Sequence, residues 1–275
     1  MPTGDVAVTD PAANGLPSIP GGWSQRDFVL AGRTLRVTLP ASPDAFLDDP
    51  QVLAANRRDD YMPYWSYLWP ASLETAVAVL NHNWQIATPP LGKGGQGGSR
   101  CSQSDCKAND EHPSVPHAKG SRDAPADETH ALEIGAGIAL TGLAALARGL
   151  SVTFSDYDQQ AIDLALFNAR QNGLEQHAEG LLLDWRHPID RQFPVIFGCD
   201  VIYEKQNHRP ILGLLQKMLA QDGQCWITDP GRHQADAFLE LLPASPFQSR
   251  HRTLVREPYP GRPAGMTNLW VLTWK

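Results

Sequence analysis

Three features are scarce in this chain, and each absence narrows what it can be. No apolar run reaches the roughly 20 residues that a membrane-spanning helix needs, and the N-terminus lacks the basic-then-apolar pattern of a signal peptide. The 275 residues include only four cysteines, too few to suggest a secreted disulfide scaffold. Lys and Arg number 23 against 30 Asp and Glu, and the resulting net charge of −7 argues against a general nucleic-acid binder. We therefore expect a cytoplasmic protein whose partner is neither membrane nor nucleic acid.

The composition that remains is that of an ordinary globular chain, with 42% hydrophobic residues. Two stretches depart from it. Residues 1–22 are rich in Pro, Gly and Ala and predict a mobile tail, and residues 92–128 are polar and glycine-rich and predict a disordered insertion. We expect residues 23–275 to form one domain, interrupted by that insertion, in a monomer.

Hydrophobic periodicity predicts an α/β fold. A β-hairpin is expected over 28–39, a helix over 44–56, and a second helix to about 82 with Ser72 as its cap. From residue 129 onward strands alternate with helices, which implies a mostly parallel sheet covered on both faces. The expected strands are 130–134, 151–155, 179–183, 194–199 and 223–228, and the expected helices are 141–149, 158–172, 206–220 and 232–242. Two final apolar runs, 248–255 and 268–274, have no helix between them and predict an antiparallel hairpin, which is typical of class I methyltransferases, whose sheet is Rossmann-like.

The most informative stretch is 131–142, ALEIGAGIALTG, which reads as a strand end, a glycine loop and a helix start. Gly135 and Gly137 allow backbone N–H groups to approach a ligand at a helix N-terminus. A dinucleotide fingerprint needs a third glycine where Leu140 stands, and the next glycine is Gly142 instead. The loop therefore fits S-adenosylmethionine, which has no pyrophosphate, better than NAD. Glu133 leads into this loop and is a further candidate for cofactor contact.

Acidic and aromatic residues follow the next two predicted strands. Asp156 stands 19 residues after Gly137, where a carboxylate can accept both ribose hydroxyls of a nucleoside, or it can favour the following helix dipole. We expect Asp158 to be that helix's cap. Asp184 and Trp185 follow the third strand, where the ring can stack on adenine and the carboxylate can accept from its amino group; alternatively Trp185 only closes the sheet edge.

The fourth of these strands is followed by Cys199-Asp200-Val-Ile-Tyr203-Glu204, where the reacting methyl group would lie. Methyltransferases that modify base amino groups carry Asn/Asp-Pro-Pro-aromatic here. The missing prolines argue against a base acceptor. Asp200 and Tyr203 remain as candidates to orient another nucleophile, although Tyr203 can also be a packed ring and Glu204 a solvated helix-start residue.

The segment 61–70, YMPYWSYLWP, holds more rings than a regular element needs, and its two prolines exclude one. An aromatic lid over a sulfonium would gain cation–π attraction, roughly 0.5–2 kcal/mol per ring. We assign that contact to Trp69, whereas we expect Tyr61 and Tyr67 to plug the space under the N-terminal hairpin. Arg232, in Asp-Pro-Gly-Arg, can hold a substrate carboxylate or pair with Asp229.

No metal site is predicted. The cysteines and histidines of the insertion have a spacing that matches no common zinc finger and lie in low-complexity sequence; they are Cys101, Cys106, His112 and His117.

Taken in order, the aromatic PYW-x2-LWP segment, the glycine loop, Asp156, Asp184-Trp185 and DVIY resemble the seven-β-strand protein-lysine methyltransferases of the methyltransferase-16 type. The branch containing the electron-transfer-flavoprotein β-subunit lysine methyltransferase is the most similar. The resemblance covers about residues 28–275 without the insertion, and it implies S-adenosylmethionine as cofactor and a lysine on a protein as acceptor. Asp200 and Tyr203 fall on the family's D-x-x-Y positions. The implied cofactor contacts are Trp69, Gly135, Ala136, Gly137, Asp156, Trp185 and Cys199, the last of which is often alanine in the family.

In this hypothesis an uncharged lysine amine attacks the sulfonium methyl in line, and the protein mainly positions and desolvates it. Asp200 would accept hydrogen bonds from the amine, and Tyr203 would bound the transfer channel. A small-molecule N-methyltransferase acting on a nicotinamide-like acceptor would use the same site, and a non-catalytic binding protein on this fold is a third possibility.

Overall fold

The computed structural model describes residues 15–84, 129–256, 258 and 264–275. Its elements are β1 (Trp23–Leu30), β2 (Arg33–Pro40), η2 (Pro43–Asp48), α1 (Pro50–Asp59), η3 (Tyr64–Ser66), α2 (Ser72–Asn81), β3 (His130–Ile134), α3 (Leu140–Arg148), β4 (Ser151–Asp156), α4 (Gln159–Gln171), η4 (Glu175–His177), β5 (Ala178–Leu182), β6 (Phe193–Cys199), α5 (Lys205–Met218), β7 (Leu219–Asp229), α6 (Gln234–Leu239), η5 (Leu242–Ala244), β8 (Phe247–Arg256) and β9 (Gly265–Trp274). Within these ranges no helix is both long and apolar enough to cross a bilayer.

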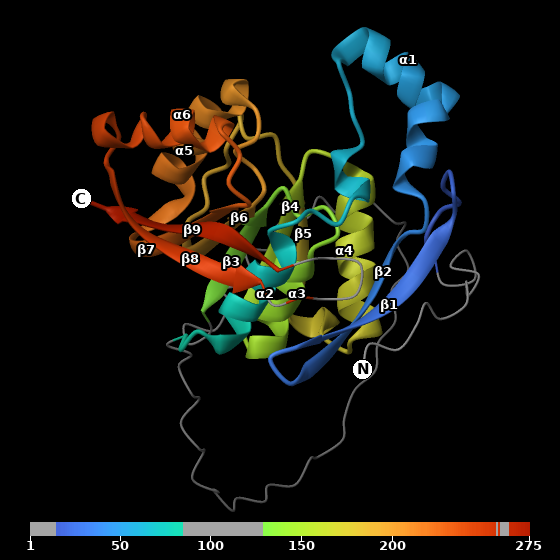
Figure 1. The fold of residues 1–275 in the computed structure, drawn as a ribbon, viewed down its shortest axis with the longest axis horizontal. Helices are drawn as coiled ribbons and strands as arrows, with labels where there is room; N and C mark the ends of the chain where they lie inside the picture. The colour runs from blue at the N-terminus through green and yellow to red at the C-terminus, as the bar shows by residue number, and fades with distance from the viewer. Residues whose placement is uncertain (1–14, 85–128, 257, 259–263) are drawn as a thin grey trace, which may run out of the picture.

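The central feature is a seven-stranded sheet of order β5-β4-β3-β6-β7-β9-β8 (Figure 1). The first five strands of that order pair in parallel, while β9 runs antiparallel to both β7 and β8. This confirms the predicted α/β fold with a C-terminal hairpin, which is the class I methyltransferase arrangement. The strand order reverses at β3, between β4 and β6, so the crevice at the carboxyl ends of β3 and β6 is where such a sheet binds ligands.

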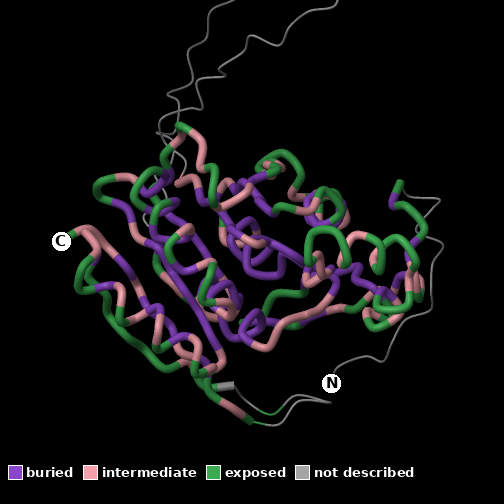
Figure 2. Tube along the Cα trace, turned by 90° about the horizontal axis from the view of Figure 1, so that it is seen from above, coloured by how far each residue is buried: buried purple, intermediate pink, exposed green. Residues whose placement is uncertain are grey.

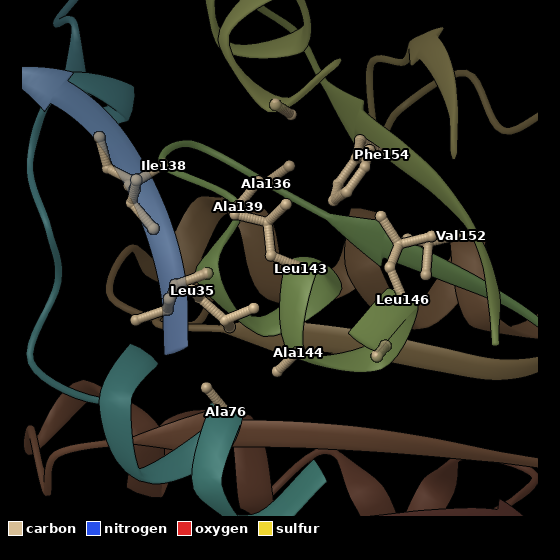
Figure 3. Close-up of a cluster of buried hydrophobic side chains, with 14 of the residues drawn as sticks. Leu35, Ala76, Ala136, Ile138, Ala139, Leu143, Ala144, Leu146, Val152 and Phe154 are labelled. Carbon is tan, nitrogen blue, oxygen red and sulfur yellow. The ribbon is translucent and has the colours of Figure 1, made fainter. Parts of the chain in front are cut away.

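Two cores form because the buried strands alternate their side chains between the two faces. On β3, Ala131 belongs to the core that α2, α3, α4 and the N-terminal hairpin share, whereas Leu132 belongs to the core beneath α5 and α6. Figure 3 shows part of the first core, where Leu143 and Leu146 of α3 lie beside Val152 and Phe154 of β4. The central strands β3, β4 and β6 are buried along most of their length, whereas β5 and β8 are largely not (Figure 2).

The N-terminal hairpin, β1 and β2, is attached to α4 by two asparagine side chains. Asn168 accepts from the Thr38 N–H and donates to the Thr38 carbonyl, at 2.8 and 2.9 Å. One helical turn later, Asn172 makes the same pair of bonds to the backbone of Arg36, at 2.9 and 2.7 Å. Asn168 and Asn172, four residues apart on α4, thus bond to Thr38 and Arg36, two residues apart on β2. Each side-chain amide bonds to the N–H and the carbonyl of one β2 residue, as the backbone of a neighbouring strand would.

Several predicted boundaries need correction. The folded part begins before residue 23, since Leu16 and Ile19 are buried in the core. Residues 44–56 are not one helix: Pro50 starts α1 after the 3-10 turn η2, and Asp49 caps it by accepting from two backbone N–H groups. Ser72 does not cap α2, because it lies inside the helix and its hydroxyl donates to the Trp69 carbonyl.

Near the C-terminus, α6 spans only Gln234–Leu239 and ends before the turn η5, so it is shorter than predicted. The predictions for residues 1–14 and 92–128 lie outside the described residues and stay predictions. Cys101, Cys106, His112 and His117 of the insertion also fall in that range. Among the described residues, no group of three or more His, Cys, Asp or Glu side chains could hold a metal ion.

Candidate functional site

A pocket of about 80 Å³ lies at the carboxyl ends of β3, β4 and β6, where the strand order reverses. It brings together the glycine loop, the strand ends and the aromatic segment, which are far apart in the sequence. Predicted site residues that line it are Trp69, Glu133, Gly135, Ala136, Gly137, Asp156, Trp185, Cys199, Asp200 and Tyr203. Asp184 lines instead an adjoining groove of about 720 Å³ that shares Tyr64, Tyr157, Trp185 and Tyr203 with this pocket.

The loop after β3 requires glycine at Gly135. Its φ of +62° is left-handed, and a Cβ there would lie 3.1 Å from both Trp185 and Val201. Gly137 is also left-handed, with φ +51°. The third glycine, Gly142, serves packing: a Cβ would lie 2.4 Å from the Phe154 ring and 2.5 Å from the Glu133 carboxylate.

Two buried carboxyl groups face this loop. Asp156 accepts from the N–H of Gly137 through one oxygen and from the N–H of Asp158 through the other, both at 3.1 Å. Burial raises the pKa of Asp156 to about 6. Glu133 accepts from the Gly142 N–H at 3.1 Å, and burial raises its pKa to about 8. At neutral pH Glu133 is therefore largely an uncharged acid, whereas Asp156 is largely a carboxylate.

The two residues after β5 differ in their surroundings. Trp185 lines both cavities. Asp184 is paired with Arg186 at 2.6 Å and also accepts from the Arg186 backbone N–H, and the Arg186 bonds lower the pKa of Asp184 to about 2. Asp158 caps α4 as predicted, by accepting from the Gln160 N–H.

On the acceptor side Asp200 is 3% exposed and has a left-handed φ of +58°. One of its oxygens pairs with Arg232 at 2.6 Å, and the other accepts from the Ala71 N–H at 2.9 Å. Burial raises the pKa of Asp200, and Arg232 opposes that shift. Arg232 also pairs with Asp229 at 2.9 Å, so its guanidinium neutralises two carboxylates of the protein, and both bonds use Nη1.

Three rings gather over the pocket. Tyr203 is parallel to Trp69 with ring centroids 6.2 Å apart, and Tyr64 meets Tyr203 edge-on at 5.3 Å. The Arg232 guanidinium lies 5.6 Å from the centre of the Trp69 ring. Burial and the nearby Glu204 raise the pKa of Tyr203, so its phenol stays neutral.

The plug predicted for Tyr61 and Tyr67 is wrong. Both rings are partly exposed, and their hydroxyls donate to Asp158 and Asp44 respectively. The buried ring of this segment is Trp65, which packs edge-on against Phe46. The sequence could not predict which ring is buried, because Pro63 and Pro70 flank a short irregular turn that has no helical or strand periodicity.

Cys199 also lines the pocket, and burial together with the adjacent Asp200 raises the pKa of its thiol well above the usual value. Several lining residues were not predicted as site residues, Tyr157 and Thr141 among them. Tyr157 directly follows Asp156, and Thr141 lies in the first turn of α3. The Thr141 hydroxyl is buried and has no hydrogen-bond partner. The sequence does show a threonine directly before Gly142, but threonine is common at helix starts, so its presence alone does not predict a site residue.

Comparisons with known proteins were consistent with this geometry. The sequence model of a family described as lysine methyltransferase matches residues 109–244. The histidine protein methyltransferase 1 homolog of Dictyostelium discoideum is 30% identical over 103 residues, which are 35% of this chain and 33% of that protein. The chain thus matches about one third of the length of this curated relative.

Solved structures with a similar fold include the ribosomal protein L11 methylase of Lactobacillus delbrueckii subsp. bulgaricus. It shares 20% identity over 55% of this chain and 72% of its own, with a TM-score of 0.42. A SAM-dependent methyltransferase from Methanosarcina mazei shares 16% identity over 54% of this chain and 93% of its own, with a TM-score of 0.45.

The family match and the fold support a methyltransferase that uses S-adenosylmethionine as its cofactor. The pocket fits such a ligand on three observations. The Thr141 hydroxyl lacks a partner, the loop carries no side chain at Gly135, where a Cβ would crowd Trp185 and Val201 of the pocket wall, and the Asp156 carboxylate accepts from the backbone N–H groups of Gly137, Asp158 and Tyr157, which leaves at least one lone pair for a ribose hydroxyl.

Proposed function

We propose that this chain transfers the methyl group of S-adenosylmethionine to the amine of a lysine side chain on a protein. The observation that carries the proposal is the position of Asp200 and Tyr203, which line the glycine-loop pocket from the end of β6. The pocket continues into the larger groove, through which a polypeptide can approach. The description of the matching family supports the lysine acceptor.

In this proposal the cofactor is held by the loop backbone at its methionine end, by Asp156 at the ribose and by Trp185 at the adenine. Once bound, it supplies the electrophilic sulfonium methyl. Glu133 and Thr141 lie beside the loop, where an uncharged acid and a hydroxyl can donate hydrogen bonds. The full set of proposed cofactor contacts is Trp69, Glu133, Gly135, Ala136, Gly137, Asp156, Asp184, Trp185 and Cys199.

A lysine amine, with an ordinary pKa near 10.4, must lose its proton before it attacks. Tyr203 cannot take that proton from a neutral phenol, but its oxygen can accept a hydrogen bond and orient the amine. One Asp200 oxygen accepts from Arg232 and the other from the Ala71 N–H and the Cys199 thiol, and the remaining lone pair can accept from the amine. The proton is then released to water, and the rings of Tyr64 and Trp69 exclude solvent from the transfer path.

A histidine acceptor is a second candidate, favoured by the similarity to the histidine protein methyltransferase 1 homolog of Dictyostelium. A neutral imidazole already presents a nucleophilic nitrogen near pH 7, so such a reaction needs no base. Mass-spectrometric localisation of the added methyl group on the modified protein distinguishes the two side chains. The same experiment distinguishes three acceptors. The labelled product is the electron-transfer-flavoprotein β-subunit, as the resemblance implies, another protein, or a small molecule.

Two variants test the proposal. Asp156→Ala should weaken the affinity for S-adenosylhomocysteine roughly 10- to 100-fold, the loss expected for hydrogen bonds to a charged group. Asp200→Ala should keep that affinity, measured by calorimetry, and lose most methyl transfer from labelled cofactor to protein. Transfer at the wild-type rate by Asp200→Ala contradicts the acceptor assignment, and failure of the wild-type protein to bind S-adenosylhomocysteine would favour the non-catalytic alternative.

A further inference from the structure

The larger groove has two walls that the cofactor pocket does not use. One wall is the C-terminal end of α1, with Ala55, Arg58, Asp59 and Asp60, followed by Tyr61 and Met62. The other is the start of α5, with Glu204, Gln206 and Asn207. We call this outer part, between α1 and α5, the α1 groove. Its inner end is the set of residues shared with the glycine-loop pocket, so a chain lying in the α1 groove can reach the acceptor side through Tyr64 and Tyr203.

The larger groove carries more negative than positive side chains. Five carboxylates and two guanidinium groups line it, and each guanidinium has an acidic neighbour: Arg58 pairs with Asp59, and Arg186 pairs with Asp184. The other three carboxylates are Asp60, Asp158 and Glu204. In the described part of the chain none of these three forms an ion pair. Glu204 accepts from the amides of Gln206 and Asn207, at 3.0 and 3.1 Å, and Asp158 accepts from the Tyr61 hydroxyl. The surplus is therefore negative and lies on both walls.

The helix that forms the first wall contributes little to the core, where only its Val52 packs against the buried cluster. No residue of α1 is buried, and Figure 1 shows the helix standing away from the sheet. Tyr157, which lines the larger groove, is 55% exposed although its ring is large and largely apolar. Aromatic faces beside unpaired carboxylates suit the alkyl stems and cationic heads of lysine and arginine side chains.

We infer that the α1 groove binds a basic segment of the protein that carries the acceptor, with lysine or arginine side chains beside Asp60 and Glu204. The inference rests on the proposed function, because only a polypeptide acceptor presents residues next to its reacting side chain. Charge complementarity of this kind selects partners and speeds association more than it adds affinity.

The experiment uses the full-length protein saturated with S-adenosylhomocysteine, so that the cofactor pocket is filled. The probe is a fluorescent eight-residue peptide of alternating lysine and glycine, compared with the same peptide acetylated on every lysine. The variant Asp60→Asn/Glu204→Gln removes one charge from each wall; asparagine tolerates the left-handed φ of +56° at position 60. The matched control, Asp222→Asn/Glu240→Gln, removes two exposed charges outside the groove.

We expect the wild-type protein and the control variant to bind the lysine peptide equally, and the groove variant to bind it about fivefold more weakly. The difference should shrink at high salt, since exposed charges are screened. Equal affinities of the two double variants overturn the inference, as does equal binding of the lysine and acetyl-lysine peptides by the wild-type protein. Failure of the proposed function looks different: the groove variant binds the peptide more weakly as expected, yet the wild-type protein methylates no protein.

Discussion

Glu133 illustrates how a single residue combines structural and functional demands. It is the penultimate residue of β3, is buried, accepts a hydrogen bond from the Gly142 N–H and lines the pocket, and burial raises its pKa to about 8. An unfolded glutamic acid titrates near 4.3. Between these two pH values the folded protein holds a proton that the unfolded chain has lost, so the free energy of unfolding falls as pH rises. Glu133 thus destabilises the ligand-free protein at neutral pH.

Glu133→Gln should remove this dependence, because the amide carries no titrating proton and its oxygen can still accept from the Gly142 N–H. Thermal unfolding of the ligand-free protein at pH 5, 6, 7 and 8 measures the effect. The wild-type melting temperature should decline more steeply over this range than that of the variant. Parallel declines in the two proteins would show that Glu133 does not govern the trend and that other groups, such as Asp156, do.

At the scale of elements, the contact between the hairpin and α4 depends on a matched pair of side-chain amides. Asn168 is fully buried, whereas Asn172 is partly exposed, although both make the same two bonds to β2. Water can replace the bonds of Asn172 but not those of Asn168. The sequence predicted the hairpin, yet asparagines at 168 and 172 read as ordinary helix residues because their partners lie some 130 residues earlier.

Asn168→Ala should lower the free energy of unfolding by about 2–4 kcal/mol, because it leaves a buried N–H and a buried carbonyl of Thr38 unpaired. Asn172→Ala, its matched control, should cost about 1 kcal/mol or less. Urea unfolding with comparable m values measures both losses. Equal losses in the two variants would mean that burial does not set the strength of this contact.

At the scale of the whole molecule, the site is assembled from segments on both sides of residues 85–128. Tyr64 and Trp69 come from the segment before this range, and the glycine loop, Asp156, Trp185 and the acceptor residues come after it. The described residues that line the pocket and the α1 groove lie within 55–72 and 133–207. The prediction that residues 92–128 are an insertion into one domain therefore has a direct test.

Replacement of residues 92–128 by a short Gly/Ser linker should leave the affinity for S-adenosylhomocysteine within about twofold of the wild-type value, since no proposed contact is removed. Calorimetry measures the affinity, and circular dichroism checks that the fold is kept. A folded variant with a loss of tenfold or more would show that the insertion contributes to the cofactor site.

The sequence by itself determined the order and type of most elements, because period-two and period-3.6 apolar patterns are local, and it located the glycine loop and the residues at the strand ends. It missed boundaries where proline and capping decide, as at Pro50 and Ser72. Only the tertiary structure decided the partners. Arg232 pairs with Asp200 as well as with Asp229, Trp65 rather than Tyr61 or Tyr67 is the buried ring, the Thr141 hydroxyl faces the pocket unpaired, and α1 forms a wall of the groove. Each of these contacts joins residues that pattern cannot relate, because their distance in space is set by how the layers pack and not by their spacing along the chain.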